Sequence, residues 1–378
     1  MDWMPLERAF EENFSHHDEL GAAVAVWCGR DDRPLLQLQE GWMDRQRRRP
    51  WTSETLSPVW SATKGPAAWC LLQAMADAGL AASTPVAELW PQLRAARPES
   101  GSTAATLGDV LHHRLGLAAI DEVVDGLDHS AVVAALERQP PQWRPGSGQG
   151  YHPRTFGWLV DELVRRLSDT ASLGEFWEQR LRQPRELEFW IGLPAAEHGR
   201  VATMVPGKWT QAHAADPFYA SLNRPDSLQA RAFRSPDVAR RVADIGRPEI
   251  LAAGLAAFGG VGTAAALARF YAGLAARPPV GPCALPASSQ AEDTVLLRPL
   301  AFRSGYMVTP DLPAAGGGLF GADRRRFGYP GAGGVLAFAD PRRQLGFAYV
   351  MNQMELRVLP ATKAPRLVRA FDRVTATD

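Results

Sequence analysis

Apolar and polar positions near the start of the chain alternate first with a helical period and then with a strand pattern. The amphipathic segment 4–16 predicts a helix, because its apolar positions recur along one face. Apolar runs at 22–27 and 35–38 then flank the polar turn 29–34. This arrangement predicts a hairpin of two strands.

A second hairpin is predicted near the end of the chain. Apolar runs at 334–339 and 345–351 flank the turn 340–344, and the scarcity of polar residues in both runs indicates that these strands are largely buried. The amphipathic stretch 361–374 predicts a closing helix. Both ends of the chain therefore have α/β character.

The middle of the chain has mostly helical periodicity, with loops rich in proline and glycine. The predicted helices span residues 67–80, 107–115, 130–138, 155–167 and 263–274. We expect an α/β (α+β) fold in which an antiparallel sheet, flanked by the terminal helices, is interrupted by a mostly helical insertion. The single domain 1–378 would comprise an α/β subdomain of 1–60 and 290–378 and a mainly helical subdomain of 61–289, with the active site between them.

Composition narrows the class of protein. With 378 residues, 46% hydrophobic residues and a formal net charge of +0, the chain can bury a large core but lacks the basic excess of a nucleic-acid-binding protein. The first residues lack the pattern of a signal peptide, and no apolar run approaches the ~20 residues of a membrane span. We therefore expect a cytoplasmic protein without nucleic-acid or membrane partners; its oligomeric state is left open.

Cysteine and histidine residues give little support to a metal site. Cys28, Cys70 and Cys283 are far apart and set among apolar neighbours, which favours reduced thiols over disulfides. The pairs His16-His17 and His112-His113 could suggest metal binding, but adjacent residues point apart on a helix and no cysteine or carboxylate stands at ligand spacing. We expect neither a metal nor another cofactor.

The strongest local signal for chemistry is the sequence V-W-S-A-T-K-G-P at 59–66, which precedes a long apolar helix. A spacing of three places Lys64 one turn from Ser61 on the same face, where its amine can accept the hydroxyl proton. The chain has only three lysines, and lysine suits a base better than arginine does. A serine at a helix start with a solvated lysine is the alternative interpretation.

A tyrosine follows in the glycine-rich loop G-Q-G-Y-H-P at 148–153. Such a loop can present the hydroxyl of Tyr151 to a site, and a protonated Lys64 nearby would lower the pKa of the phenol so that it could move a proton. A half-buried structural tyrosine is the alternative. His152 is a rival base, or an ordinary hydrogen-bonded loop histidine.

Glycines gather again in F-G-Y-P-G-A-G-G at 327–334, directly before a predicted strand. They would let a substrate approach the strand edge, where backbone N–H groups can bind a carbonyl oxygen and its oxyanion. A tight turn before a strand explains the same pattern.

Together and in this order, the three motifs resemble those of the penicillin-recognising serine hydrolases, which include class C β-lactamases, D-Ala-D-Ala carboxypeptidases and the β-lactamase-like esterases. The resemblance covers most of the chain and is greatest for the esterases. It implies a β-lactamase-like fold in which Ser61 is acylated, Lys64 is the base and Tyr151 assists proton transfer. It also implies an oxyanion hole formed by the N–H groups of Ser61 and Ala332.

Two departures from the family pattern bear on substrate. Pro153 stands where Y-x-N places an asparagine, and Tyr329-Pro330-Gly331 stands where K-T-G or H-x-G places a cation or imidazole. Both departures weaken recognition of β-lactam amides and substrate carboxylates. We expect Tyr329, Gly331, His152 and Trp60 to contact the substrate. Trp158 and Trp190 are among the tryptophans expected near the cleft, of which one or two would line an acyl pocket.

The sequence therefore predicts a carboxylesterase that acts on neutral esters, with a small-molecule ester or acyl donor as its partner. An acyltransferase that uses the same acyl-enzyme remains open, as does a weak β-lactamase or D-amino-acid peptidase. An inactive binding or regulatory homologue is a remote alternative. No G-x-S-x-G elbow occurs, which argues against an α/β-hydrolase triad.

Overall fold

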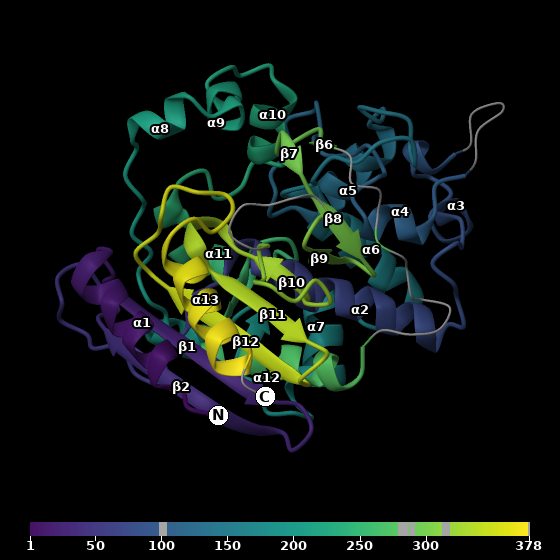
Figure 1. Cartoon of the computed structure of the whole chain (residues 1–378). Helices are drawn as coiled ribbons and strands as arrows, with labels where there is room; N and C mark the ends of the chain where they lie inside the picture. Colours follow the sequence, from purple (N-terminus) through teal and green to yellow (C-terminus); the bar gives the residue numbers. More distant parts are fainter. Residues whose placement is uncertain (98–103, 279–286, 288–291, 312–317, 377–378) are drawn as a thin grey trace.

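The computed structural model describes residues 1–97, 104–278, 287, 292–311 and 318–376 (Figure 1). Its largest sheet has seven strands in the order β2-β1-β12-β11-β10-β9-β8, all paired antiparallel. The strands are β1 (Gly21–Cys28), β2 (Arg33–Gly41), β8 (Ala301–Arg303), β9 (Tyr306–Val308), β10 (Phe327–Pro330), β11 (Leu336–Asp340) and β12 (Leu345–Met351). The pairing of β1 with β12 joins the two ends of the chain in one sheet.

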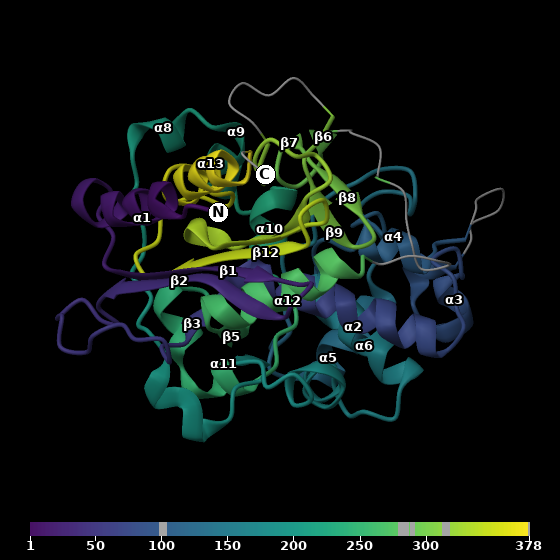
Figure 2. The same cartoon turned by 60° about the horizontal axis from the view of Figure 1, so that its bottom comes forward.

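Three helices cover the two faces of this sheet (Figure 2). Helices α1 (Met4–His16) and α13 (Lys363–Ala376) lie together on one face, and α12 (Ala264–Ala276) lies on the other. The contact with α12 is close, because a Cβ added to Gly346 of β12 would lie 2.0 Å from the carbonyl oxygen of Ala268. This helix falls within the range 61–289 predicted for the helical subdomain, but its small apolar residues pack it against the sheet.

The remaining helices are α2 (Lys64–Asp77), α3 (Val86–Leu89), α4 (Leu107–Leu111), α5 (His129–Arg138), α6 (Thr155–Leu167), α7 (Leu173–Trp177), α8 (Gln211–Ala214), α9 (Pro217–Leu222), α10 (Leu228–Arg234) and α11 (Pro248–Ala252). Of these, α2 to α6 lie beside the sheet, whereas α8 and α9 lie on the side of α13 and α11 on the side of α12 (Figure 2). Helix α2 packs against α6 and α7 and is buried along most of its length, as expected for a helix that is apolar around its circumference.

A small sheet that the sequence analysis did not predict supports the start of α2. Its order is β3 (Ser57–Pro58), β5 (Gly260–Gly262), β4 (Phe189–Ile191). Beyond β3, the N–H of Val59 donates to the carbonyl oxygen of Gly260 at 2.9 Å. These strands have two or three residues each, too few for a periodic signal. A further two-stranded pair is formed by β6 (Glu292–Asp293) and β7 (Arg298–Pro299).

The α/β fold with an antiparallel sheet, terminal helices and a helical insertion is confirmed. The predicted helices 4–16 and 155–167 match α1 and α6 at both ends, whereas the helix predicted at 67–80 begins earlier, at Lys64. That shift places the lysine at the first position of α2.

Other expectations concern thiols, metal and membrane. Cys70 is buried and Cys28 is partly exposed, and neither forms a disulfide, whereas Cys283 lies outside the described residues. Within those residues, no group of three or more His, Cys, Asp or Glu side chains is arranged to hold a metal ion. None of the helices described is both long enough and apolar enough to cross a membrane.

Candidate active site

Ser61 lies on a single tight turn, Trp60–Thr63, that leads directly into α2. Trp60 has a φ of 51°, a left-handed conformation that is strained for a bulky residue. Thr63 fixes the turn: its Oγ1 donates to the carbonyl oxygen of Trp60 at 2.6 Å and accepts from the N–H of Gly260 at 2.9 Å. The turn therefore holds Ser61, which is partly exposed, in one orientation.

Lys64 is completely buried beneath Ser61. Its Nζ donates to the carbonyl oxygens of Pro153 at 2.8 Å and Ala257 at 2.9 Å, and lies 3.4 Å from Ser61 Oγ. Burial lowers the pKa of Lys64 well below its usual value, which favours the neutral amine. A neutral amine has two N–H bonds and one lone pair. With both N–H bonds of that form donated to the carbonyls, its lone pair would be left for Ser61 Oγ, whereas the protonated form donates to that oxygen as well.

The surroundings of Lys64 are aromatic. Its Nζ lies 4.9 Å from the ring centre of Tyr151 and 5.9 Å from that of Phe156. No carboxylate in the part of the chain that the structure describes pairs with this amine. Without a counter-ion, the protonated form of Lys64 gains little to offset its loss of hydration.

Tyr151 is also buried, and its hydroxyl lies within hydrogen-bonding reach of the Ser61 side chain. The backbone N–H of Tyr151 donates to both carboxylate oxygens of Asp293, at 3.0 and 2.8 Å. The sequence analysis expected a lowered phenol pKa next to a protonated lysine. Instead, burial raises the pKa of Tyr151, and the nearby charge of Asp293 acts in the same direction. The phenol can therefore give a proton but does not rest as a phenolate.

His152 has both ring nitrogens engaged by backbone groups. Its Nε2 accepts from the N–H of Leu117 at 3.0 Å, so the proton is on Nδ1, which donates to the carbonyl oxygen of Gly150 at 2.6 Å. Burial lowers the pKa of His152 to about 3. This geometry is that of a structural loop histidine and leaves no ring nitrogen for Ser61 or for a substrate.

Tyr329 of β10 is fully buried, with its hydroxyl 3.2 Å from Nε2 of His113. His113 Nδ1 accepts from the backbone N–H of His152 at 3.1 Å. Burial lowers the pKa of His113 well below its usual value, so the neutral ring carries its proton on Nε2 and donates it to Tyr329. Tyr329 therefore keeps its own hydroxyl proton for another acceptor. Its predicted contact with a substrate is untested.

The backbone after β10 approaches the turn that carries the serine. A Cβ added to Gly331 would lie 2.2 Å from the carbonyl oxygen of Val59, a separation that only glycine permits. The N–H of Gly331 donates to the carbonyl oxygen of Val335 at 2.8 Å. The next N–H, of Ala332, has no acceptor among the described residues, and neither has the N–H of Ser61. Two unpaired donors beside one nucleophile can bind an oxyanion.

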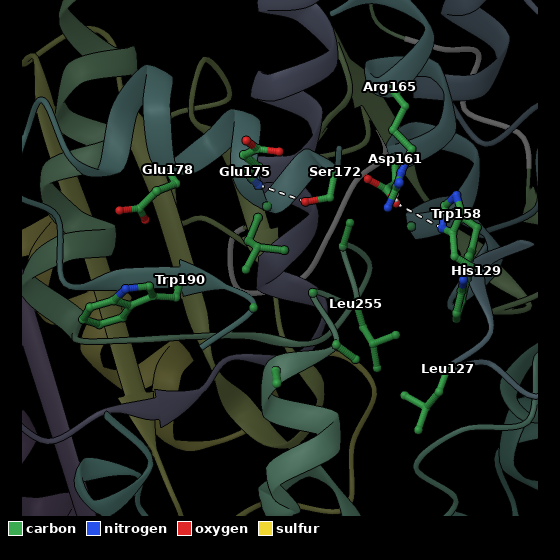
Figure 3. Close-up of a pocket in the computed structure, with 18 of the residues that line it drawn as sticks. Leu127, His129, Trp158, Asp161, Arg165, Ser172, Glu175, Glu178, Trp190 and Leu255 are labelled. Carbon is green, nitrogen blue, oxygen red and sulfur yellow. Dashed lines mark hydrogen bonds and ion pairs between the residues drawn. The ribbon is translucent and has the colours of Figure 1, made fainter. Parts of the chain in front are cut away.

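A pocket of about 410 Å³ lies beside α6 (Figure 3). Its lining includes Trp158 and Trp190 but not Ser61, Lys64 or Tyr151. Its wall includes Ala256, which immediately precedes the residue whose carbonyl holds Lys64.

Comparison with known proteins decides the family. Residues 6–370 match the family model described as Beta-lactamase. The chain belongs to the beta-lactamase family. The match spans both the sheet and the helical insertion, so it covers every residue of the site described above.

Relatives within the beta-lactamase family include esterases. The chain is 30% identical over 364 residues, 92% of its length and 80% of the relative's, to the esterase/beta-lactamase LipL of Mycobacterium tuberculosis. A penicillin-binding protein homolog from Caulobacter crescentus is 29% identical, with a TM-score of 0.80 and coverage of 98% of this chain and 97% of that chain. A family VIII carboxylesterase is 28% identical, with a TM-score of 0.76 and the same coverage. The chain is a β-lactamase-like serine hydrolase.

The structure brings together three residues that the sequence motifs singled out, with supports that the motifs did not indicate. Ser61, Lys64 and Tyr151 come together, and Gly331 brings Ala332 beside them. His113, Asp293 and the carbonyl of Ala257 were missed. His113 was weighed only as a metal ligand. Nothing in the sequence near 257 or 293 signals a contact with residues that are far away along the chain.

Proposed function

We propose that this protein is a carboxylesterase that hydrolyses neutral esters through an acyl-enzyme on Ser61. The Lys64 amine accepts the hydroxyl proton as Ser61 Oγ bonds to the ester carbonyl carbon. The N–H groups of Ser61 and Ala332 bind the resulting oxyanion. Tyr151 gives its proton to the departing alkoxide and regains one from Lys64; water then attacks the acyl-enzyme by the reverse route and releases the acid.

The observation that carries this proposal is the hydrogen bonding of Lys64. Two backbone carbonyls accept from Nζ, which lies 3.4 Å from Ser61 Oγ, so the neutral amine would have its lone pair free to accept the serine proton. A lysine that only stabilised the fold would gain more from a carboxylate partner, and the described residues provide none. This distance is longer than that of a strong hydrogen bond, which is common before a substrate is bound.

The preference for neutral esters is supported by the groups around Tyr329. The family's cation position is occupied by a buried phenol, and its neighbour His113 is neutral. A substrate carboxylate would therefore find no positive partner in these two residues. The names of two relatives, a family VIII carboxylesterase and an esterase/beta-lactamase, agree with ester chemistry.

The test is to incubate the protein with a short p-nitrophenyl ester and, separately, with nitrocefin, and to follow both turnover and intact mass. We expect ester turnover and an acyl adduct that is absent in Ser61→Ala, with little turnover of nitrocefin. Adduct without release would indicate acyl transfer, to be tested by adding amines or alcohols. Neither turnover nor adduct from the ester would refute the proposal.

A further inference from the structure

The pocket beside α6 is not used by the mechanism proposed above (Figure 3). Its lining comes mainly from α6, from the segment 172–182 that contains α7, from β4 and from the segment 252–256. At about 410 Å³ it falls within the range of ~300–1,000 Å³ that is usual for pockets that bind small molecules. The pocket is therefore large enough for a ligand of its own.

Two tryptophans in the lining have indole N–H groups without a protein acceptor. Trp158 and Trp190 are only 5% and 6% exposed, and neither indole donates to an acceptor within the part of the chain that the structure describes. The equally buried Trp177, by contrast, donates its indole N–H to the carbonyl oxygen of Phe189 at 2.9 Å. Because a buried indole N–H usually has a partner, these two donors favour a ligand that carries acceptor oxygens.

The carboxylates of the lining already have partners. Each of the three, those of Asp161, Glu175 and Glu178, accepts at least two hydrogen bonds from the protein. Asp161, for example, accepts from the Nε of Arg165 at 3.1 Å and from the N–H of Leu173 at 2.5 Å. A cationic ligand would have to displace one of these donors, so the pocket does not favour an amine.

Other donors in the lining are still unused. The guanidinium of Arg165 is bonded to Asp161 through Nε alone, so its two terminal nitrogens have no acceptor among the described residues. The hydroxyl of Ser172 accepts from the N–H of Glu175 at 3.1 Å but donates to none of the described acceptors. Figure 3 shows Arg165, Asp161 and Ser172 together on one side of the pocket. A guanidinium with two free nitrogens matches the geometry of a carboxylate.

We propose that this pocket is a second ligand site, which binds a monocarboxylate with an apolar body. The terminal N–H groups of Arg165 and the hydroxyl of Ser172 bind the carboxylate, and the apolar side chains of the lining, Trp158 and Leu255 among them, contact the body. Binding here does not depend on ester hydrolysis, because Ser61 and Lys64 do not line the pocket.

The first experiment compares three probes that share one apolar body and differ in charge: 4-phenylbutyrate, 4-phenylbutanamide and 4-phenylbutylamine. Ligand-observed NMR titration gives the Kd of each for the full chain. We expect the acid to bind about tenfold more tightly than the neutral amide, because a charge-assisted pair with arginine is lost in the amide. The amine should bind most weakly. No binding of the acid, or equal Kd values for acid and amide, would overturn the proposal.

Arg165→Leu tests the arginine, and Arg166→Leu is its matched control. Arg166 lies on the same helix and likewise donates through Nε to a carboxylate four residues earlier, that of Glu162, at 2.8 Å, but it does not line the pocket. We expect Arg165→Leu to raise the Kd of 4-phenylbutyrate about tenfold and Arg166→Leu to leave it unchanged. The same Kd in Arg165→Leu as in wild type would overturn the assignment of this residue as the carboxylate partner.

Amide hydrogen exchange locates the probe in the wild-type protein and needs no variant. Saturating 4-phenylbutyrate should raise the protection of peptides that cover 172–178 and 252–256, and leave a peptide that covers 33–41 unchanged. Unchanged protection of the first two, or added protection only around Ser61, would overturn the proposal. If no ester is hydrolysed, the proposed function fails, while this measurement still decides whether the pocket binds a carboxylate.

Discussion

Replacing Lys64 with methionine separates the cost of burying this amine from its benefit to catalysis. Methionine is also unbranched and can fill the space between the rings of Tyr151 and Phe156, but it cannot donate to the carbonyls of Pro153 and Ala257. At about 1 kcal/mol net for each lost hydrogen bond, Lys64→Met should lower the free energy of unfolding by ~2 kcal/mol where the amine is neutral in both states.

That difference should depend on pH with a definite sign. Burial lowers the pKa of Lys64 in the folded protein, whereas the unfolded chain protonates it below its usual value near 10.5. Wild type therefore loses ~1.4 kcal/mol of stability for each pH unit below about 10.5 until the folded-state pKa is reached. The variant has no such loss, so the two stabilities should cross near pH ~9. Below that pH the variant should be the more stable protein.

The assay is urea unfolding of wild type and Lys64→Met at several values from about pH 8 to 10, combined with ester hydrolysis. Lys208→Met is the control, because that side chain is 82% exposed and its difference from wild type should not vary with pH. We expect Lys64→Met to lose about 10²- to 10⁴-fold in kcat/KM. A stability difference that stays constant over this range would show that the amine is not held neutral, and would refute the reasoning for Lys64 as base.

Two further predictions concern the supports of the site. His113→Asn should keep an acceptor for the N–H of His152 but lose the donor to Tyr329. In a double-mutant cycle measured by urea unfolding, its effect on the unfolding free energy should therefore couple to that of Tyr329→Phe by ~1 kcal/mol. Additive effects would contradict the assigned hydrogen bond. In Gly331→Ala, the new Cβ would lie 2.2 Å from a carbonyl oxygen and would displace the Ala332 N–H. We expect a lower Tm in differential scanning fluorimetry and a kcat reduced about tenfold. An unchanged kcat would contradict this placement of the oxyanion hole.

Tyr329 and His152 each have a hydrogen-bond partner in a segment that the sequence motifs do not include. Tyr329 was expected to contact a substrate from its place in the family motif, and His152 from its place beside Tyr151; both contacts stay predictions. In the structure, His113 and backbone groups are their hydrogen-bond partners. A motif indicates that a residue lies near a site, but the direction of its side chain depends on neighbours from other segments.

The sequence by itself determined the fold class, the family and the order of the reactive residues. These features depend on periodicity and on spacing within single segments, such as the three residues from Ser61 to Lys64. Tertiary structure alone decided the protonation states and the supports. Burial sets the pKa of Lys64, and the carbonyls and the carboxylate that direct the site come from 153, 257 and 293, far along the chain. Desolvation and hydrogen-bond direction are properties of the packed environment, and no single segment encodes them.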